Sequence, residues 1–579
     1  MGSHKDIRWQ EWGEEPFQQA KEAKKPILLD LSAVWCHWCH VMDETSYSDD
    51  EIIGLINDDF IPVRVDIDRR PDIRERYNFG GYPTTAFLNG EGEIISGGTY
   101  LPPDQMKKAL LQIKNHFERT GGTVDHTHRR PPEVDVEAPQ EGLNEEIYEE
   151  ILGHLLQQYD EVFGGFGGAP KFPQPDILDL ALYHHQASGN DFFRKIVEKS
   201  LDGMAGGGMY DHVEGGFFRY SVTRDWSEPH YEKMLDVNIG LLRNVLNAYA
   251  VLGKEAYRDL AKDVLRYLEA SLRDPKEGFW GSQDADEEYY GLPLEERKKR
   301  DAPYIDRTVY TDLSGQAIET YLLASSVLGE DTYRDTALAT LARLEEQVMT
   351  EEGSLFHYWD GAARVDAMLG DYVYLARAFL TAYEHTGTEH YLARSEALVQ
   401  RMTAVLTDER GLLMDRRAEE GDIGLLQEGQ RPLMDNAHAA LLLLKLHELT
   451  RKEEYGQAAS QILEGFGSQY RRYTTFASGY ALALEAYRKG VLKIDVVLED
   501  GAEEEPEILA PFLRAFRPVW VVRPLSVGTE SFQAANYPEE PVPAIYACKG
   551  ELCSPPITSS SPLEEVVAFA ADLRAPVPP

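Results

Sequence analysis

A repeated helical pattern between residues 141 and 490 constrains the fold of this 579-residue chain more than any other feature of its sequence. Six stretches in this range are apolar nearly all round, as expected of buried helices. Five of them open with an aspartate and the sixth with a serine, and successive aspartates are about 60 to 76 residues apart. The opening residues are Asp176, Asp236, Asp312, Asp371, Asp435 and Ser478.

A more charged, amphipathic helix accompanies each apolar helix, for example over residues 258–274 and 391–409. Twelve helices that alternate between buried and half-exposed predict an (α/α)6 toroid, with the six apolar helices as its inner ring. The N-terminal ends of the inner helices then gather around one mouth. Asp and Ser are also good N-cap residues, which explains their position without a function.

The flanking regions have a different pattern, with short apolar strands. Residues 5–120 alternate strands and helices, which predicts a compact α/β domain. The region 121–140 is rich in Gly, Pro and charged residues and is predicted to be a linker. Residues 491–579 contain short strands and a last helix and are predicted to form a small α/β domain. The chain is therefore expected to be multidomain, with the toroid at 141–490.

The bulk composition excludes some partners. The formal net charge is −41, which repels nucleic acid and anionic membrane surfaces. Four cysteines in this length and the absence of an apolar segment in the first residues favour a reducing compartment, so a cytoplasmic location is expected. No apolar run reaches the ~18 residues of a membrane span. The sequence leaves the oligomeric state open.

The stretch "AVWCHWCH" contains Cys36 and Cys39, and this motif has three interpretations. A haem attachment site requires export and an axial ligand, neither of which is indicated. A zinc site requires two further ligands in tetrahedral reach, which His37 and His40 cannot easily supply. Cys548 and Cys553 could supply them only through a contact between the two ends of the chain. The third interpretation is a thioredoxin-type redox pair. It is favoured because the cysteines follow a buried strand and open a helix, whose positive end stabilises a thiolate.

Two further residues support the redox interpretation. Asp30 lies six residues before Cys36, where thioredoxins have a buried proton acceptor, and "GGYPTT" supplies a candidate cis-proline at Pro83. Cys36 is then the attacking thiolate and Cys39 the resolving thiol, with a protein disulfide or a small thiol as partner. No metal or cofactor is expected.

A second candidate site lies in the helical region, where residues 206–238 and 278–291 are rich in ionisable and aromatic side chains. Such groups suit a concave site for a hydroxyl-rich, carbohydrate-like ligand. Paired carboxylates serve glycoside hydrolysis, and histidines serve the proton abstraction of an epimerase. Helix capping and satisfied buried histidines are the structural alternative. The candidate residues are Asp211, His212, Arg219, Tyr220, Trp226, His230, Glu232, Lys233, Asp236, Asp284, Asp286, His357 and His438.

Three functional hypotheses remain at this stage. The first is a thiol–disulfide oxidoreductase whose helical domain recruits or senses a partner. The second is a carbohydrate-active enzyme, an epimerase or a glycosidase, with the thioredoxin-like domain as redox control or scaffold. The third is a non-catalytic protein that binds a ligand at the toroid mouth. A redox assay, a sugar-turnover assay and ligand binding without turnover distinguish them.

Several long blocks of the sequence resemble the spermatogenesis-associated protein 20 family, whose bacterial and archaeal members are named thioredoxin domain-containing proteins. They include "CHWCHVMDETSYSDD", "GGYPTTAFLN", "GGFGGAPKFP", "GGGMYDHVEGGFFRYSVTRDWSEPHYEKMLDVN" and "QDADEE". The resemblance implies an N-terminal thioredoxin-like domain and a six-hairpin domain like those of glycosidases and N-acylglucosamine 2-epimerases. It also implies that Cys548 and Cys553 form the family's C-terminal cysteine pair. Tyr231 and the run Asp236-Val237-Asn238 depart from the family pattern.

Overall fold

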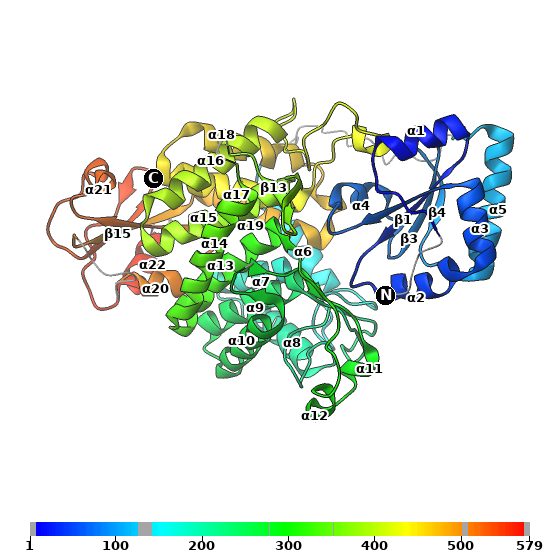
Figure 1. Cartoon of the computed structure of the whole chain (residues 1–579). Coiled ribbons are helices and arrows are strands. Elements are labelled where there is room, and N and C mark those ends of the chain that lie inside the picture. Colours follow the sequence, from blue (N-terminus) through cyan, green and yellow to red (C-terminus); the bar gives the residue numbers. More distant parts are fainter. Residues whose placement is uncertain (1–6, 125–141, 277, 351–352, 501–507, 573–579) are drawn as a thin grey trace. The chain divides into compact units, whose positions relative to one another are not determined.

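The computed structural model of the chain describes residues 7–124, 142–276, 278–350, 353–500 and 508–572 (Figure 1). The chain divides into two compact units. The first comprises Met1–Asp135, Ser282–Asp306 and Asp415–Gln430, and the second comprises Val136–Gly281, Arg307–Met414 and Arg431–Pro579. Most of the predicted linker, 125–140, lies outside the described residues. The predicted domain limits stay predictions. Two segments of the range 141–490, residues 282–306 and 415–430, belong to the first unit.

The first unit contains a four-stranded sheet with the order β2-β1-β3-β4. Strand β1 is central and pairs parallel with β2 and antiparallel with β3, which pairs antiparallel with β4. The side chains of β1 and β3 are buried almost throughout, as expected of strands covered on both faces. The strands are β1 (Ile27–Ser32), β2 (Ile61–Asp66), β3 (Thr84–Leu88) and β4 (Ile94–Gly98).

Helices cover both faces of this sheet. Leu28 of β1 and Phe87 of β3 pack in one apolar cluster with residues of α2, α3 and α5, while α1 contacts β1 and β2. Figure 1 shows α3 and α5 on one side of the strands and α4 on the other. The arrangement is that of a thioredoxin-like domain. The helices are α1 (Glu14–Ala23), α2 (His37–Glu44), α3 (Asp50–Asp59), α4 (Pro71–Tyr77) and α5 (Pro103–Thr120), with a 3-10 turn, η1 (Ser46–Ser48).

Residues 415–430, which carry the 3-10 turn η4 (Gly424–Gln427), pack against α4 within the first unit. The buried guanidinium of Arg76 donates to both carboxylate oxygens of Asp415, at 2.6 and 3.2 Å. It also donates to the carbonyl oxygens of Leu425, at 2.8 Å, and Glu428, at 2.6 Å. The hydroxyl of Tyr77 accepts from the Leu425 N–H at 3.0 Å. This segment is thus attached through buried charge-assisted hydrogen bonds, which are stronger than neutral ones.

The other added segment, residues 282–306, carries two short helices and two short strands. Arg297 is its buried anchor and donates to the carbonyl oxygens of Tyr290, at 2.6 Å, and Leu292, at 2.9 Å. Its guanidinium also lies over the rings of Tyr289 and Tyr290. The segment therefore has a small core of its own. Its elements are β10 (Ser282–Gln283), α11 (Glu287–Tyr290), α12 (Leu294–Arg297) and β11 (Ile305–Asp306).

Six helices of the second unit form a closed ring. Each contacts the next in the order α7, α9, α13, α15, α17, α19, and α19 contacts α7 again. Six further helices pack outside them: α8, α10, α14, α16 and α18 each against its sequence neighbour in the ring, and α6 against α19. The predicted (α/α)6 toroid is thereby confirmed. The ring helices are α7 (Pro175–Ser188), α9 (Leu235–Leu252), α13 (Thr311–Leu328), α15 (Leu369–Thr386), α17 (Leu433–Thr450) and α19 (Ser478–Lys489).

The outer helices are α6 (Glu145–Gln158), α8 (Asp191–Gly206), α10 (Glu255–Tyr267), α14 (Asp331–Val348), α16 (Glu389–Leu406) and α18 (Glu453–Phe466). Short strands and helical turns connect the hairpins: β5 (Tyr220–Ser221), β6 (Pro229–His230), β7 (Lys233–Met234), the short π-helix η3 (Leu268–Leu272), β8 (Arg273–Asp274), β9 (Gly278–Phe279), β12 (Val309–Tyr310), β13 (Phe356–Trp359), β14 (Ala363–Asp366), η5 (Tyr470–Arg472) and η6 (Thr474–Ala477).

The acidic residues that open the ring helices lie inside the first turn rather than at the N-cap. Asp176, for example, follows Pro175, and the N-cap is Gln174. The first turns of neighbouring ring helices meet, since the Asp312 N–H donates to Asp371 at 3.2 Å. A carboxylate in the first turn is stabilised by the helix dipole, which accounts for the repeated aspartate in physical terms.

The second unit also holds a C-terminal sheet of order β16-β15-β17-β18. Strand β15 pairs parallel with β16 and antiparallel with β17, and β17 pairs antiparallel with β18. The Val542–Pro543 peptide bond before β17 is cis. The elements are β15 (Leu492–Leu498), α20 (Ala510–Arg514), β16 (Trp520–Ser526), α21 (Glu530–Ala535), β17 (Ala544–Lys549), β18 (Leu552–Cys553) and α22 (Pro562–Asp572). Among the described residues, no helix combines the length and the apolar character that a membrane crossing requires.

Candidate functional site

The dithiol motif lies at the junction of the central strand and the following helix. Strand β1 ends at Ser32, and Cys36 is the N-cap of α2. Cys36 and Cys39 form a disulfide, and the Cys36 sulfur accepts a hydrogen bond from the Cys39 N–H at 3.2 Å. The first cysteine is thus placed at the positive end of a helix, which stabilises a thiolate once the bond is reduced.

The peptide bond between Tyr82 and Pro83 is cis, as the sequence predicts, and β3 begins at the next residue. The Tyr82 ring packs edge to face with Trp35, which directly precedes Cys36. The Trp35 indole N–H donates to the carboxylate of Asp68. The residues before the dithiol are therefore held by an aromatic contact on one side and a hydrogen bond on the other.

Asp30 is buried in β1 and is paired with a cation. Its carboxylate accepts from Arg64 Nε at 2.7 Å and from the Tyr47 hydroxyl at 3.2 Å, and Arg64 also binds Asp43 at 2.6 Å. Burial raises the pKa of Asp30 above its usual value, although the Arg64 charge opposes this shift. A buried carboxyl that retains its proton to higher pH is suited to exchange a proton with a neighbouring group.

A second carboxyl with a raised pKa was not found from the sequence. Asp66 ends β2, opposite Ser32 of β1, and accepts the backbone N–H groups of Asp68 and Arg69. Burial and the nearby carboxylates of Asp68 and Asp306 raise the pKa of Asp66 to about 7. The two aspartates of "VDID", at the end of a predicted strand, were the sequence signal for neighbouring carboxylates. The third carboxylate, Asp306, could not be foreseen because it belongs to a distant segment.

The segment 282–306 reaches the dithiol helix within the first unit. Asp284 Oδ2 lies 3.5 Å from Nδ1 of His40, one residue after Cys39. Cys36 and Cys39 are both buried.

The raised pKa of Asp30 leads to a prediction about stability. Because its pKa is higher in the folded than in the unfolded chain, Asp30 favours folding at pH values below the usual pKa of a carboxyl group. That contribution is lost as the pH rises through the folded pKa. We expect Asp30→Asn to become progressively more stable than the wild type as the pH is raised from 4 to 8. Each unit of pKa difference corresponds to about 1.4 kcal/mol. Thermal unfolding across this pH range measures the effect, and Asp43→Asn is the matched control. A pH-independent difference would contradict the assignment.

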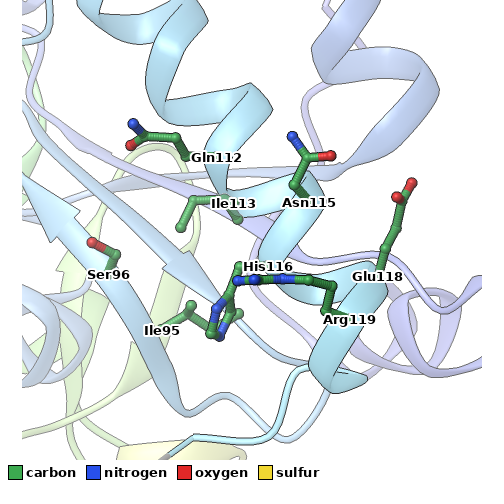
Figure 2. A pocket seen from close by; sticks show the side chains of 8 residues that line it. All are labelled: Ile95, Ser96, Gln112, Ile113, Asn115, His116, Glu118 and Arg119. Atoms are coloured by element: carbon green, nitrogen blue, oxygen red, sulfur yellow. The ribbon is translucent and has the colours of Figure 1, made fainter.

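A surface hollow of about 730 Å³ lies on another part of the first unit (Figure 2). Ile95 and Ser96 of β4 and the last turns of α5, including His116 and Arg119, line it. It contains none of the predicted site residues, and Cys36 is not among its lining residues. We assign no function to it.

The toroid encloses a small polar cavity of about 150 Å³. All six ring helices contribute side chains to it or approach it, and Phe516 and Pro518 from the C-terminal region complete its wall. The charged and polar lining residues are Asp176, Asp179, Arg243, Asn247, Glu319, Arg377, Thr381, Glu384, His438 and Lys445. Buried charges must be paired. A cavity lined so densely by charged groups therefore needs a network of ion pairs and hydrogen bonds, which an ordinary apolar core does not.

A continuous hydrogen-bonded chain crosses this cavity. Arg377 forms an ion pair with Glu319 at 3.2 Å and donates from Nη1 to His438 Nδ1 at 3.1 Å. Since Arg377 can only donate, His438 Nδ1 accepts, and Nε2 carries the hydrogen that reaches Asp176 Oδ2 at 3.2 Å. Arg243 donates to the other oxygen of Asp176 at 2.8 Å. The four ring helices α7, α13, α15 and α17 are thus joined, with α9 at one end.

The two aspartates of α7 respond differently to this surrounding. His438 and Arg243 lower the pKa of Asp176 well below its usual value despite its burial. For Asp179, burial is the largest effect and raises the pKa, although Arg243 lies 2.9 Å away. Asp176 is therefore the fixed negative charge of the cavity, and Asp179 is the carboxyl that more readily holds a proton.

Sequence reasoning identified His438 but missed Arg243, Glu319 and Arg377. Each of these three is an ionisable residue near the middle of a ring helix that is otherwise largely apolar. An ionisable residue in a buried helix is a usable signal, because a buried charge is retained only with a partner. The sequence does not say which partners meet.

Two residues of the predicted cluster 206–238 form a buried ion pair. Lys233 Nζ donates to Asp211 Oδ2 at 2.7 Å and to the Gly215 carbonyl oxygen at 2.8 Å, and both charged side chains are almost fully buried. An analogous pair, Lys171 with Asp160, lies in the preceding hairpin at 2.7 Å. Lys233 and Asp211 hold the loop before α9 in place and do not line the cavity.

The aromatic members of the cluster pack on one another. Tyr220 stacks on His230, and His230 Nδ1 lies 2.6 Å from the buried carboxylate of Glu232. Arg219 lies over the Tyr220 ring. Trp226 is buried and donates to the carbonyl oxygen of Phe163 at 3.1 Å, and His212 Nε2 is 3.1 Å from the Gly207 oxygen. Exposed Asp236 accepts the N–H of Val237.

The remaining candidates lie elsewhere. Asp284 and Asp286 belong to the first unit, where Asp286 is the N-cap of α11. His357 Nδ1 is 3.0 Å from both oxygens of Asp371. Together with Asp312, these two offer ligand atoms within 4.8 Å of one another. Asp371 also accepts the N–H groups of Met368 and Asp312, so it serves as a helix cap, and we infer no metal there. The structure does not gather the thirteen candidates in one pocket.

Comparison with known proteins places the chain among relatives. Residues 1–130 match the family model Thioredox_DsbH, described as "Protein of unknown function, DUF255". Human spermatogenesis-associated protein 20 is 24% identical over 711 aligned residues, which cover 98% of this chain and 90% of the human protein. The thiol:disulfide interchange protein DsbD of Campylobacter jejuni is 33% identical over 100 residues, covering 16% of this chain and 18% of that protein.

Among solved structures, a sugar epimerase from a ruminal bacterium is similar with a TM-score of 0.49 and 15% identity. The similarity covers 60% of this chain and 98% of the epimerase. The toroid itself rests on the closed ring of six helices described above. With the human relative aligned along nearly the whole chain, the resemblance to the spermatogenesis-associated protein 20 family is confirmed.

Proposed function

We propose that the protein is a thiol–disulfide oxidoreductase that acts through Cys36 and Cys39. The observation that carries this proposal is the Cys36–Cys39 disulfide at the start of α2, directly after the central strand of a thioredoxin-like sheet. The similarity of the first 130 residues to a thioredoxin-type family model supports it.

The reaction transfers two electrons from the reduced pair to a partner disulfide. The Cys36 thiolate attacks one partner sulfur, so that a mixed disulfide forms and one partner thiolate leaves. The Cys39 thiol gives up its proton, for which the buried carboxylate of Asp30 is the proposed acceptor, and the Cys39 thiolate then attacks the Cys36 sulfur. The Cys36–Cys39 bond forms again, and the second partner thiolate leaves and takes up a proton. A dithiol reductant restores the reduced pair.

A redox titration tests this function. Cys548→Ser/Cys553→Ser leaves Cys36 and Cys39 as the only thiols, because the chain has four cysteines. In glutathione buffers of graded ratio, we expect a reversible two-electron transition, measured by alkylation and intact mass. The reduced variant should also reduce insulin disulfides. A pair that neither titrates reversibly nor reduces insulin would refute the proposal.

A second candidate function is the binding of a small, hydroxyl-rich ligand in the toroid cavity. The cavity presents both hydrogen-bond donors, on Arg243 and Arg377, and acceptors, on Asp176 and Glu319. Its volume of about 150 Å³ is smaller than that of sites for drug-sized ligands, so a single sugar ring is the appropriate class. Both ring nitrogens of His438 already have partners, which favours binding over proton transfer.

Ligand-dependent unfolding tests the second function. We expect one of D-glucose, D-mannose or N-acetyl-D-glucosamine to raise the unfolding temperature. A ligand at 100 times its Kd stabilises by about 2.7 kcal/mol. Arg377→Met should abolish this shift, whereas Arg364→Met, at an exposed ion pair with Asp360, should preserve it. If no sugar shifts the transition, or if the shift persists in Arg377→Met, the cavity is not the binding site.

A further inference from the structure

The C-terminal sheet has the same topology as the thioredoxin-like sheet. Both have the central first strand paired parallel with the second strand and antiparallel with the third, and the fourth strand antiparallel at the edge. From β15 to α22 the order is strand, helix, strand, helix, strand, strand, helix, and from β1 to α5 it is the same except that two helices, α2 and α3, separate the first two strands. The strand order 2-1-3-4 therefore occurs twice in the chain.

The two sheets also share a buried ion pair at the same place. Asp30 is the fourth residue of β1 and lies opposite Arg64 of β2, which donates to it at 2.7 Å. Asp495 is the fourth residue of β15 and lies opposite Arg523 of β16, which donates to both of its oxygens at 2.7 and 2.6 Å. Both aspartates are buried. Topology alone does not require a charged pair inside a sheet, so this is an independent point of likeness.

A tyrosine hydroxyl completes the likeness. Tyr47 donates to Asp30 at 3.2 Å, and Tyr537 donates to Asp495 at 2.7 Å. Tyr537 has a further contact, because its hydroxyl oxygen lies 3.2 Å from the Cys548 sulfur and 3.9 Å from the Cys553 sulfur. In the C-terminal sheet, Tyr537 thus connects the buried pair of Asp495 and Arg523 directly to a disulfide.

The position of that disulfide is the main difference between the two sheets. Residues 499–509, which follow β15, contain no cysteine. Cys548 of β17 and Cys553 of β18 face each other as register partners and form the bond. Cys548 is fully buried, whereas Cys553 is exposed and follows Leu552, whose exposure is 57%. One sulfur is therefore open to an incoming thiol, and the other contacts the tyrosine.

We propose that the C-terminal region is a second thioredoxin-like domain and that Cys548–Cys553 is a second thiol–disulfide exchange site, which accepts two electrons from a dithiol. An incoming thiolate attacks Cys553, the mixed disulfide forms, and Cys548 leaves as a thiolate. The Tyr537 hydroxyl turns its hydrogen bond from Asp495 to this thiolate. The second thiol of the reductant then attacks the reductant sulfur that is bonded to Cys553, and Cys553 leaves as a thiolate. The products are two protein thiols and an oxidised, cyclic reductant.

A purely structural bridge accounts less well for these features. The two cysteines are only five residues apart, and the stabilisation from a disulfide grows with the length of the loop it closes. Strand β17 is already held by its pairing with β15. A structural bridge also has no need of an exposed sulfur or of a hydroxyl that links the other sulfur to a buried carboxylate.

The test uses the full-length Cys36→Ser/Cys39→Ser variant, in which Cys548 and Cys553 are the only cysteines. The folded protein is incubated with dithiothreitol, quenched with iodoacetamide and weighed by intact mass spectrometry. We expect two alkyl groups per chain, and none after reoxidation with oxidised dithiothreitol. Tyr537→Phe should slow reduction on the order of tenfold, because a hydrogen bond to the leaving thiolate is lost.

Tyr546→Phe is the matched control. Tyr546 stacks on Tyr537 in the same sheet, with ring centroids 4.0 Å apart, and should leave the rate unchanged. Reduction only after unfolding in urea, or equal rates in the two tyrosine variants, would overturn the proposal. The result is independent of the proposed function of Cys36 and Cys39, because that pair is absent here and is tested in the Cys548→Ser/Cys553→Ser variant.

Discussion

Cys36→Ser is expected to lower the rate of insulin reduction by roughly a hundredfold or more, because the variant lacks the attacking thiolate. Cys39→Ser should lose steady-state turnover to a similar extent but for a different reason. Its Cys36 still attacks, and without a resolving thiol the mixed disulfide accumulates. The turbidity of precipitating insulin measures turnover, and non-reducing electrophoresis detects the trapped complex.

The control for both variants is Cys548→Ser/Cys553→Ser, which should keep the insulin activity because it retains the Cys36–Cys39 pair. Substantial activity in Cys36→Ser would show that another thiol performs the reaction. A trapped complex in Cys36→Ser instead of Cys39→Ser would reverse the roles of the two cysteines.

Lys233→Met is expected to destabilise the second unit by about 3–5 kcal/mol. The substitution leaves the buried carboxylate of Asp211 without the ammonium that now lies 2.7 Å away. It also removes the donor to the Gly215 oxygen and a cation that lies over the Tyr267 ring. Urea unfolding followed by helical circular dichroism measures the loss, since this unit holds the toroid helices.

Two further variants show whether the unpaired charge is the cause. Lys254→Met removes an exposed ion pair with Asp202 and should cost no more than about 1 kcal/mol. Adding Asp211→Asn to Lys233→Met should recover much of the lost stability, because no buried charge then remains unpaired. A loss of under 1 kcal/mol in Lys233→Met would mean that the pair does not stabilise the loop.

The architecture was largely predictable because its signals are local. Apolar helices at regular separations indicate a ring whatever the details of its packing. The dithiol motif between a strand and a helix likewise needs only neighbouring residues to be interpreted. The closed ring of α7 to α19 and the Cys36–Cys39 disulfide are both present. Even the recurrent aspartates are explained locally, although they lie in the first helical turn and not at the N-cap.

The content of the polar cavity was far less predictable. The loop before α9 was the densest polar cluster in the sequence, yet Asp211 and Lys233 neutralise each other inside that loop. Arg243, Glu319 and Arg377 meet in the cavity although each lies in a different helix. Which polar groups become partners depends on the register and tilt of helices that are far apart in the sequence, such as those of Glu319 and Arg377, 58 residues apart.

The sequence by itself determined the kinds of element in each region, the helical ring and the dithiol turn, because periodicity and short motifs act within a few residues. Tertiary structure alone decided which charges are paired in the toroid cavity and that residues 282–306 and 415–430 pack in the first unit. It also decided that the C-terminal strands follow the order of the N-terminal sheet. These outcomes depend on contacts between residues that are far apart in the sequence. Such contacts form, and contribute energy, only when folding brings those residues together.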